Sequence, residues 1–169
     1  GSVGIVFPTN RPSGTGRETT LEYSIRIAAS LANLCAKYGY SFDIIAGEQC
    51  LRNAGWQESM DFLARLEAEG KDTQVELSGV VGPNQIVVAV TSPIETELVP
   101  VLSRLSGQVW NMVVVLLQGF APIEKDSEFR VKGGNFNIVT CSRGNLKEAV
   151  AKLSNSLSSA NRLSNQVTR

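Results

Sequence analysis

The sequence contains no histidine. Histidine is the commonest general base at neutral pH and a frequent metal ligand in proteins. Its absence excludes a Ser-His-Asp triad, a Cys-His dyad and a histidine-ligated zinc site. A serine hydrolase is disfavoured further, because no strand pattern runs into a Gly-x-Ser-x-Gly elbow. We therefore assign no catalytic residue and expect a protein without enzymatic activity.

Cysteine is scarce: the chain has three, at Cys35, Cys50 and Cys141, and no two of them form a Cys-x-x-Cys pair. Cys35 falls on the apolar face of a predicted helix, and Cys141 ends a predicted strand. We expect buried thiols in a reducing compartment rather than disulfides or a redox pair. No basic residue adjoins any of the three in the sequence, which disfavours a reactive thiolate.

Neither sign of charge predominates, since 16 Lys and Arg residues balance 16 Asp and Glu residues. A balanced chain has no global field to attract nucleic acid or an anionic membrane, so no nucleic-acid partner is expected. No apolar run approaches the ~20 residues that span a bilayer, and no signal peptide is recognisable. Gly1 and Ser2 look like a cloning remnant, so we expect a domain cut from a longer parent protein, any membrane anchor of which would lie outside this chain.

Strand and helix patterns alternate along the chain. Short apolar runs predict strands at 3–7, 41–46, 85–90, 110–117 and 136–140, and the segment 47–55 fits a loop or an edge hairpin. Helical periodicity predicts helices over 20–38, 56–69, 96–105 and from 146 to about 157, with Trp56 on an inner face. The Ser- and Asn-rich end predicts fraying from Ser154, with 158–169 as a frayed tail.

This alternation implies βαβ crossovers. We predict one α/β domain over 1–169 with a doubly wound, mainly parallel sheet and helices on both faces, a Rossmann-like three-layer sandwich. The first helix has the clearest boundaries. Thr19 and Glu22 have capping-box spacing at its start, and Gly39 suits the left-handed residue that commonly ends a helix.

In a sheet of this kind ligands lie outside the carboxyl ends of the strands, at the point where the strand order reverses. That rule selects the loops at 8–19 and 91–93. The polar side chains there are our candidates for an interaction or ligand rim, without any assigned metal ligand or cofactor: Thr9, Asn10, Arg11, Ser13, Thr15, Arg17, Thr91 and Ser92.

The loop from Ser13 to Thr19 has a second interpretation. It precedes a helix N-terminus, where free amides and the helix dipole attract anions. Its Ser-Gly-Thr-Gly order resembles the phosphate loop of flavodoxins, which implies an FMN-binding or nucleotide-phosphate-binding protein as the alternative function. Glu18 stands where that loop has another hydroxyl, and the loop starts late after its strand. We favour a polar turn that leads into a capped helix.

A longer resemblance covers about residues 3–157. The chain is similar there to the von Willebrand factor A-like half of an uncharacterised bacterial family. The shared pattern is the segment Leu-Glu-Tyr-Ser-Ile-Arg-Ile-Ala-Ala-Ser-Leu-Ala at 21–32, followed by Gly39, a strand and Leu-Ala-Arg-Leu at 63–66. Members of that family, a domain of unknown function, are often encoded beside MoxR-type AAA+ ATPases. The resemblance implies a protein–protein interaction module that works with such an ATPase. It also implies a domain on the cytoplasmic side of a parent protein anchored in the inner membrane.

The resemblance bears on metal binding as well. A typical von Willebrand factor A domain holds Mg²⁺ through an Asp-x-Ser-x-Ser loop after the first strand and an aspartate after a later strand. Aligned on the strand ends, this chain has Pro8, Asn10 and Pro12 at the loop positions and Ser92 or Pro93 at the last. Mg²⁺ is usually bound through one or two carboxylates. The resemblance therefore implies a degenerate, metal-free site.

Overall fold

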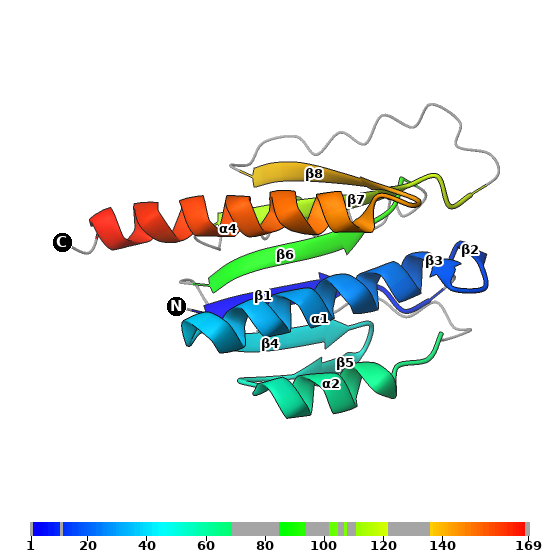
Figure 1. Ribbon diagram of the computed structural model, residues 1–169, viewed down its shortest axis with the longest axis horizontal. Coiled ribbons are helices and arrows are strands. Elements are labelled where there is room, and N and C mark those ends of the chain that lie inside the picture. Colours follow the sequence, from blue (N-terminus) through cyan, green and yellow to red (C-terminus); the bar gives the residue numbers. More distant parts are fainter. Residues whose placement is uncertain are drawn as a thin grey trace.

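The computed structural model describes residues 2–10, 12–68, 85–93, 102–104, 107, 111–121 and 136–167. Their main feature is a six-stranded sheet with the order β5-β4-β1-β6-β7-β8 (Figure 1). The strands are β1 (Ser2–Phe7), β4 (Ser41–Ala46), β5 (Gln49–Leu51), β6 (Gln85–Thr91), β7 (Asn111–Gln118) and β8 (Phe136–Ser142). Neighbouring strands are parallel except β5, which runs antiparallel to β4. The predicted doubly wound, mainly parallel sheet is confirmed.

The central strands are apolar along their whole length because both of their faces are buried. Val113 and Val115 of β7 join the core under the described helices, while Met112 and Val114 are just as fully buried on the opposite face. Continuous apolar runs of this kind are typical of parallel strands covered on two sides. At the end of the sheet, β8 alternates instead, and its Ile138 is 48% exposed.

Three helices lie on the same face of the sheet: α1 (Thr20–Tyr38), α2 (Trp56–Ala64) and α4 (Leu146–Val167) (Figure 1). The middle one, α1, packs on β1 and β4 and also contacts both other helices. Their shared core with the sheet includes Phe7, Ile27, Leu31, Phe42 and Leu153. The helix predicted at 96–105 lies outside the described residues, except for 102–104, which are helical. None of the described helices is long and apolar enough to cross a bilayer.

The predicted ends of α1 are confirmed. The Thr19 hydroxyl oxygen accepts a hydrogen bond from the Glu22 N–H at 3.1 Å, and Gly39 ends the helix with a φ of 71°. Only half of the capping box forms, because the Glu22 carboxylate reaches forward to Arg26, 3.3 Å from its Nε, rather than back. A basic partner one helical turn later offers that carboxylate an ion pair on the helix surface.

Other boundaries and faces differ from the prediction. The segment 47–55 is an edge hairpin that carries β5. Helix α2 ends at Ala64 rather than at 69, and Trp56 at its start is 44% exposed, so its predicted place on the inner face was wrong. Ser59 and Leu63 are the buried residues of this helix. The backbone of α4 is helical to Val167, through the Ser- and Asn-rich segment, and fraying of that end stays a prediction.

Candidate functional site

The strand order reverses between β1 and β6. From β1 the chain crosses to β4 on one side, whereas from β6 it crosses to β7 on the other. The carboxyl ends of β1 and β6 therefore lie side by side, with the segment after β1 on one side and Ser92 and Pro93 on the other. In Figure 1 this is the end of the sheet at which α1 and α4 both begin. It is the edge that the sequence selects as the candidate rim.

A small cavity, the switch-point hollow, opens at this edge and has a volume of about 10 Å³. That is roughly the space needed to hold one water molecule. The structure brings the predicted rim residues Asn10, Thr91 and Ser92 together here, and it buries Thr91 and Ser92. The described residues that line the hollow are Pro8, Asn10, Pro12, Thr20, Leu21, Ser24, Val90, Thr91, Ser92 and Leu117.

Thr9 is a predicted rim residue that does not line the hollow. Its side chain is 1% exposed and lies against Gly47 in the turn after β4. The Thr9 hydroxyl oxygen has no hydrogen-bond partner there. Gly47 has a φ of +57°, and its N–H donates to the carbonyl oxygen of Phe7 at 2.9 Å. The ends of β1 and β4 are thus joined by the bond from Gly47 to Phe7, and Thr9 is buried beside it, inaccessible to a partner.

The hollow occupies the place at which the resemblance would put Mg²⁺, and its side chains do not fit that ion. The prolines Pro8 and Pro12 carry no ligand atom in their side chains, and no carboxylate is among the described residues that line the cavity. Mg²⁺ requires hard oxygen ligands in octahedral geometry, usually including carboxylates. Nor do any three Asp, Glu or Cys side chains gather elsewhere in the described part of the chain.

The segment from Ser13 to Thr20 is a short hairpin, formed by β2 (Gly14–Thr15) and β3 (Glu18–Thr19). The backbone amides at its two ends are used within the chain. The Ser13 N–H donates to Thr20 Oγ1 at 3.0 Å, and the Thr20 N–H donates to the Ser13 carbonyl oxygen at 2.9 Å. These two donors are therefore not free to bind a phosphate. A 10 Å³ hollow is also far below the ~300–1,000 Å³ of small-molecule sites. This geometry does not favour the flavodoxin-like alternative.

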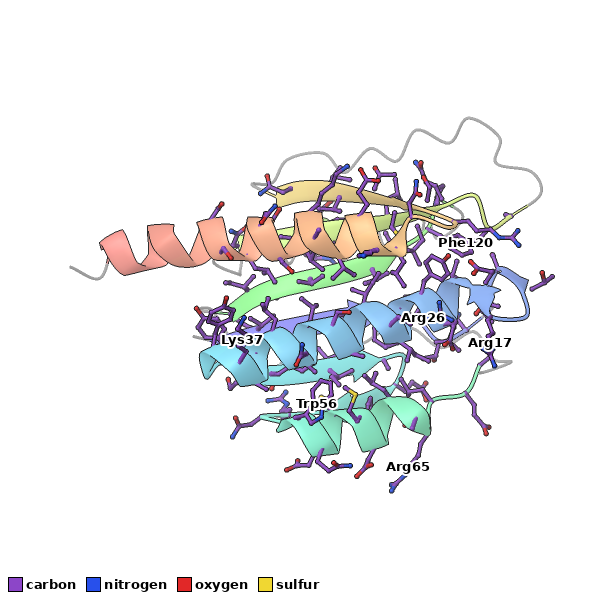
Figure 2. The ribbon with its side chains drawn as sticks, viewed as in Figure 1. Arg17, Arg26, Lys37, Trp56, Arg65 and Phe120 are labelled. Carbon is purple, nitrogen blue, oxygen red and sulfur yellow. The ribbon has the colours of Figure 1, made fainter. Side chains whose placement is uncertain are left out.

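The hairpin carries two more predicted rim residues away from the hollow. Thr15 is exposed in β2. Arg17 is exposed in the turn (Figure 2). The structure therefore separates the predicted rim into a hollow with Asn10, Thr91 and Ser92 and a projecting hairpin with Thr15 and Arg17. Ser13 joins the two parts through its hydrogen bonds to Thr20. Arg11 lies outside the described residues.

Tyr23, one turn into α1, holds this rim together and is not among the residues predicted from the sequence. Its side chain is 2% exposed. The hydroxyl donates a hydrogen bond to Glu18 Oε2 and accepts one from the Gly144 N–H at 2.9 Å. The ring packs edge-on against Phe120, which follows β7, with centroids 4.7 Å apart and planes at 79°. Burial, followed by the hydrogen bond to Glu18, raises the pKa of Tyr23 above its ordinary value.

Tyr23 thus connects the loops after three strands, since Glu18 lies in the hairpin that follows β1, Phe120 follows β7 and Gly144 follows β8. In the sequence Tyr23 is one aromatic residue near an apolar helical stripe. Nothing in that pattern points to a residue 121 positions later. The paired contacts depend on β7 and β8 being neighbours, which is a property of the folded sheet alone.

Cys35 and Cys141 are buried, as the sequence predicts, whereas Cys50 is exposed on the edge strand β5. Burial raises the pKa of the Cys35 thiol to about 12 and that of Cys141 to about 11. Both thiols therefore stay protonated at neutral pH. Because the thiolate is the nucleophilic form, neither is suited to covalent chemistry.

A scan of protein-family profiles and a search of curated proteins both find no match to this chain. Among solved structures the chain is similar to the crystal structure of the SpRpn10 VWA domain, where VWA denotes von Willebrand factor A. The TM-score is 0.52 at 11% sequence identity, and the match covers 89% of this chain and 94% of that one. At this identity the likeness concerns the fold and not the residues of a site. The chain has a von Willebrand factor A-like fold.

Proposed function

We propose that this chain is a protein–protein interaction module without enzymatic activity, whose metal-binding motif is degenerate. The observation that carries the proposal is the make-up of the carboxyl edge. Among the described residues, its hollow of about 10 Å³ is lined by prolines, aliphatic side chains, hydroxyls and one amide. Such a surface offers hydrogen bonds and shape, and none of these residues is an acid or base that could activate the hydroxyls as nucleophiles.

The rigidity of the edge supports a binding role. Loops that bind proteins gain affinity when they are held in place before the encounter, because less conformational entropy is lost. Here the hairpin is fastened to α1 through Ser13 and Thr20, and it is linked through Glu18 and Tyr23 to the turn at Gly144. The exposed face of the hairpin, with Thr15 and Arg17, is therefore presented from a fixed support.

The partner and the location follow from the sequence resemblance. We propose a MoxR-type AAA+ ATPase, encoded beside the gene of the parent protein, as the protein that binds this edge. The domain would work on the cytoplasmic side, and the parent protein would be anchored in the inner membrane. The von Willebrand factor A-like fold is compatible with this role and does not by itself select the partner.

Affinity capture of that ATPase by the immobilised chain tests the proposal. The double variant Thr15→Glu/Arg17→Glu changes two exposed hairpin residues, and Lys37→Glu is the control. Lys37 lies at the far end of α1, roughly 25 Å from Thr20 at 1.5 Å per residue (Figure 2). We expect the double variant to lose capture and Lys37→Glu to retain it. Equal capture by all three proteins would contradict an interface at the hairpin.

Calorimetric titration tests the degenerate metal site separately. We expect no saturable heat when Mg²⁺ or Mn²⁺ is added to the chain, because Pro8, Asn10 and Pro12 supply no carboxylate. Asn10→Asp adds one carboxylate at the hollow and serves as a comparison. A saturable sub-millimolar site in the unchanged chain would contradict a degenerate motif.

A further inference from the structure

A second cavity lies at the opposite edge of the sheet from the switch-point hollow, and we call it the aromatic groove. It is lined by the last two turns of α1, by Tyr40 and Ser41 at the start of β4, and by Trp56 in the first turn of α2 (Figure 2). Its volume is about 380 Å³, within the ~300–1,000 Å³ that is usual for ligand sites. Unlike the hollow, the groove is large enough to hold a ligand.

Aromatic side chains surround this groove. Tyr40 and Trp56 line it together with the small side chains of Ala32 and Ala36 on α1. Tyr38 extends the aromatic surface beyond the groove, because its ring centroid lies 6.4 Å from that of Tyr40, with the ring planes 35° apart. Trp56 and Tyr38 are two of the three large hydrophobic residues that are exposed in the described part of the chain. Exposed apolar side chains that gather around one cavity indicate a binding surface.

The side of the groove formed by Asn53 and Ala54 is held in place by the sheet. Asn53 has a φ of +50°, the only positive value among the non-glycine residues that the structure describes. Its N–H donates to Asp43 Oδ1 at 2.7 Å, and Asp43 Oδ2 accepts a hydrogen bond from Nε2 of the buried Gln85 at 2.8 Å. The Ala54 N–H donates to the Phe42 carbonyl oxygen at 2.8 Å. Because this side is fixed before a ligand arrives, less conformational entropy is lost on binding.

The polar atoms of the groove favour an uncharged ligand that accepts hydrogen bonds. Within the described part of the chain, the Trp56 indole N–H, the Ser41 hydroxyl and the Asn53 side-chain amide bond no other residue. Indole is a donor only, and the hydroxyl and the amide can also donate. No charged side chain lines the groove among the described residues. The groove therefore offers donors to a ligand and no ion-pair partner.

The groove is open, which favours a segment of chain over a small molecule. Ala36, Asn53, Gly55 and Trp56 all line it and are all exposed. Small-molecule sites bury roughly 70–90% of the surface of their ligand, which a groove with exposed walls does not achieve. An extended segment that crosses the groove and continues over Tyr38 would contact the whole aromatic surface.

From these features we infer that the aromatic groove binds a proline-rich segment of a partner protein in the polyproline II conformation. Such segments dock into aromatic-lined grooves, and they lose little entropy because their conformation is already formed. Proline has a carbonyl acceptor and no N–H donor, which matches a surface whose indole, hydroxyl and amide donors are free. The inference goes beyond the proposed function, because it assigns a second surface and the chemistry of the segment that it binds.

A fluorescein-labelled oligoproline peptide is the probe, and fluorescence anisotropy with the 169-residue chain is the measurement. We expect saturable binding that changes little with salt, because no ion pair forms, and no binding of a glycine-serine peptide of the same length. Trp56→Ala should weaken oligoproline binding at least about tenfold, since it removes the exposed ring. Trp56→Phe keeps a ring but loses the N–H and should weaken binding about threefold. Ile138→Ala is the matched control, because Ile138 is an exposed apolar residue on β8, and it should leave binding unchanged.

Tyr38→Ala tests whether the ligand extends beyond the groove. We expect it to weaken oligoproline binding about threefold, because the peptide loses one aromatic contact. An unchanged affinity of this variant would overturn an extended segment. Equal binding of the oligoproline and glycine-serine peptides, or an unchanged affinity of Trp56→Ala, would overturn the proline-rich ligand. Indole, titrated alone, represents the other ligand class, and its saturable binding without any binding of oligoproline would assign the groove to a small aromatic molecule and overturn the inference.

These outcomes are separable from those of the proposed function, because the hairpin and the groove lie at opposite edges of the sheet. Thr15→Glu/Arg17→Glu should bind oligoproline as the unchanged chain does, and Trp56→Ala should still capture the AAA+ ATPase. If the ATPase is captured through the hairpin but oligoproline does not bind, the proposed function stands and the proline-rich ligand is overturned. If oligoproline binds as expected and the ATPase is not captured, the groove stands and the choice of ATPase fails.

Discussion

The hydroxyl of Tyr23 accepts a hydrogen bond from the backbone N–H of Gly144 at 2.9 Å, across 121 residues of sequence. The bond connects α1, the first helix of the chain, to the turn that precedes α4, the last of the described helices. Both helices lie on one face of the sheet, and both begin at the carboxyl edge (Figure 1). A single buried oxygen therefore joins the starts of the first and last described helices at the proposed interaction surface.

Removal of that oxygen should be costly. We expect Tyr23→Phe to lower the free energy of unfolding by about 1–2 kcal/mol, because the Gly144 N–H and the Glu18 carboxylate both lose their hydrogen bond to the buried hydroxyl. Urea denaturation measures the change. Tyr38→Phe is the matched control, since Tyr38 is 57% exposed and its change should stay within about 0.5 kcal/mol. Equal effects of the two variants would contradict the bridging role.

The parts of the fold that could be predicted from the sequence depend on local signals. Helix α1 was predicted to its exact ends because Thr19 caps its first turn and Gly39 can adopt the left-handed conformation that ends it. The order of buried strands followed from continuous apolar runs. The face of α2 could not be predicted in the same way. Trp56 fits an apolar stripe by spacing, but the helix is short, and its burial depends on how far α1 covers it.

The candidate site was predictable only in part, for a related reason. Asn10, Thr91 and Ser92 come together because parallel strands place their carboxyl ends at one edge, which is a general rule of such sheets. Three other features depend on contacts that no local pattern specifies. They are the orientation of Thr9 away from the hollow, the folding of 13–19 into a hairpin, and the contact of Tyr23 with Gly144.

Two glycines in the left-handed region allow backbone strain to be separated from steric overlap. Gly47 has a φ of +57° and Gly39 a φ of +71°. A Cβ at Gly39 would meet nothing within 4 Å, whereas a Cβ at Gly47 would overlap the Thr9 hydroxyl. We expect Gly39→Ala to cost about 1 kcal/mol from strain alone. Gly47→Ala should cost at least roughly 2 kcal/mol, because strain and overlap add.

A double-mutant cycle, measured by thermal or urea unfolding, tests how much of the cost at Gly47 comes from steric overlap with Thr9. In Thr9→Ala the hydroxyl is gone, so the additional cost of Gly47→Ala should fall towards that of Gly39→Ala. An unchanged additional cost in the Thr9→Ala background would mean that the overlap does not contribute, and that strain at Gly47 accounts for the whole effect.

The Thr9 hydroxyl provides a prediction with the opposite sign. It is buried without a hydrogen-bond partner, and an unsatisfied buried polar group carries a desolvation cost. Thr9→Val keeps the branched shape and replaces the hydroxyl with a methyl group. We therefore expect the free energy of unfolding to rise by about 1 kcal/mol, measured by urea denaturation. Thr15→Val, at an exposed position, is the control and should change little. A less stable Thr9→Val protein would contradict the unsatisfied state of this hydroxyl.

The buried thiols predict a loss of stability in alkali. Burial raises the pKa of Cys35 from 9.0 to about 12 and that of Cys141 from 9.0 to about 11. Above pH 9 the unfolded chain releases thiol protons that the folded chain keeps, so the folded state binds more protons and its stability falls as pH rises towards those values. Below pH 9 both states keep their thiol protons, so the thiols cause no loss of stability there.

Urea denaturation on either side of pH 9 measures how steeply the free energy of unfolding falls with pH, and Cys35→Ala/Cys141→Ala should make that fall less steep. The raised pKa of Tyr23 adds a decline of the same sign only above 10.0. An equal slope in the double variant would mean that the two thiols are not its source.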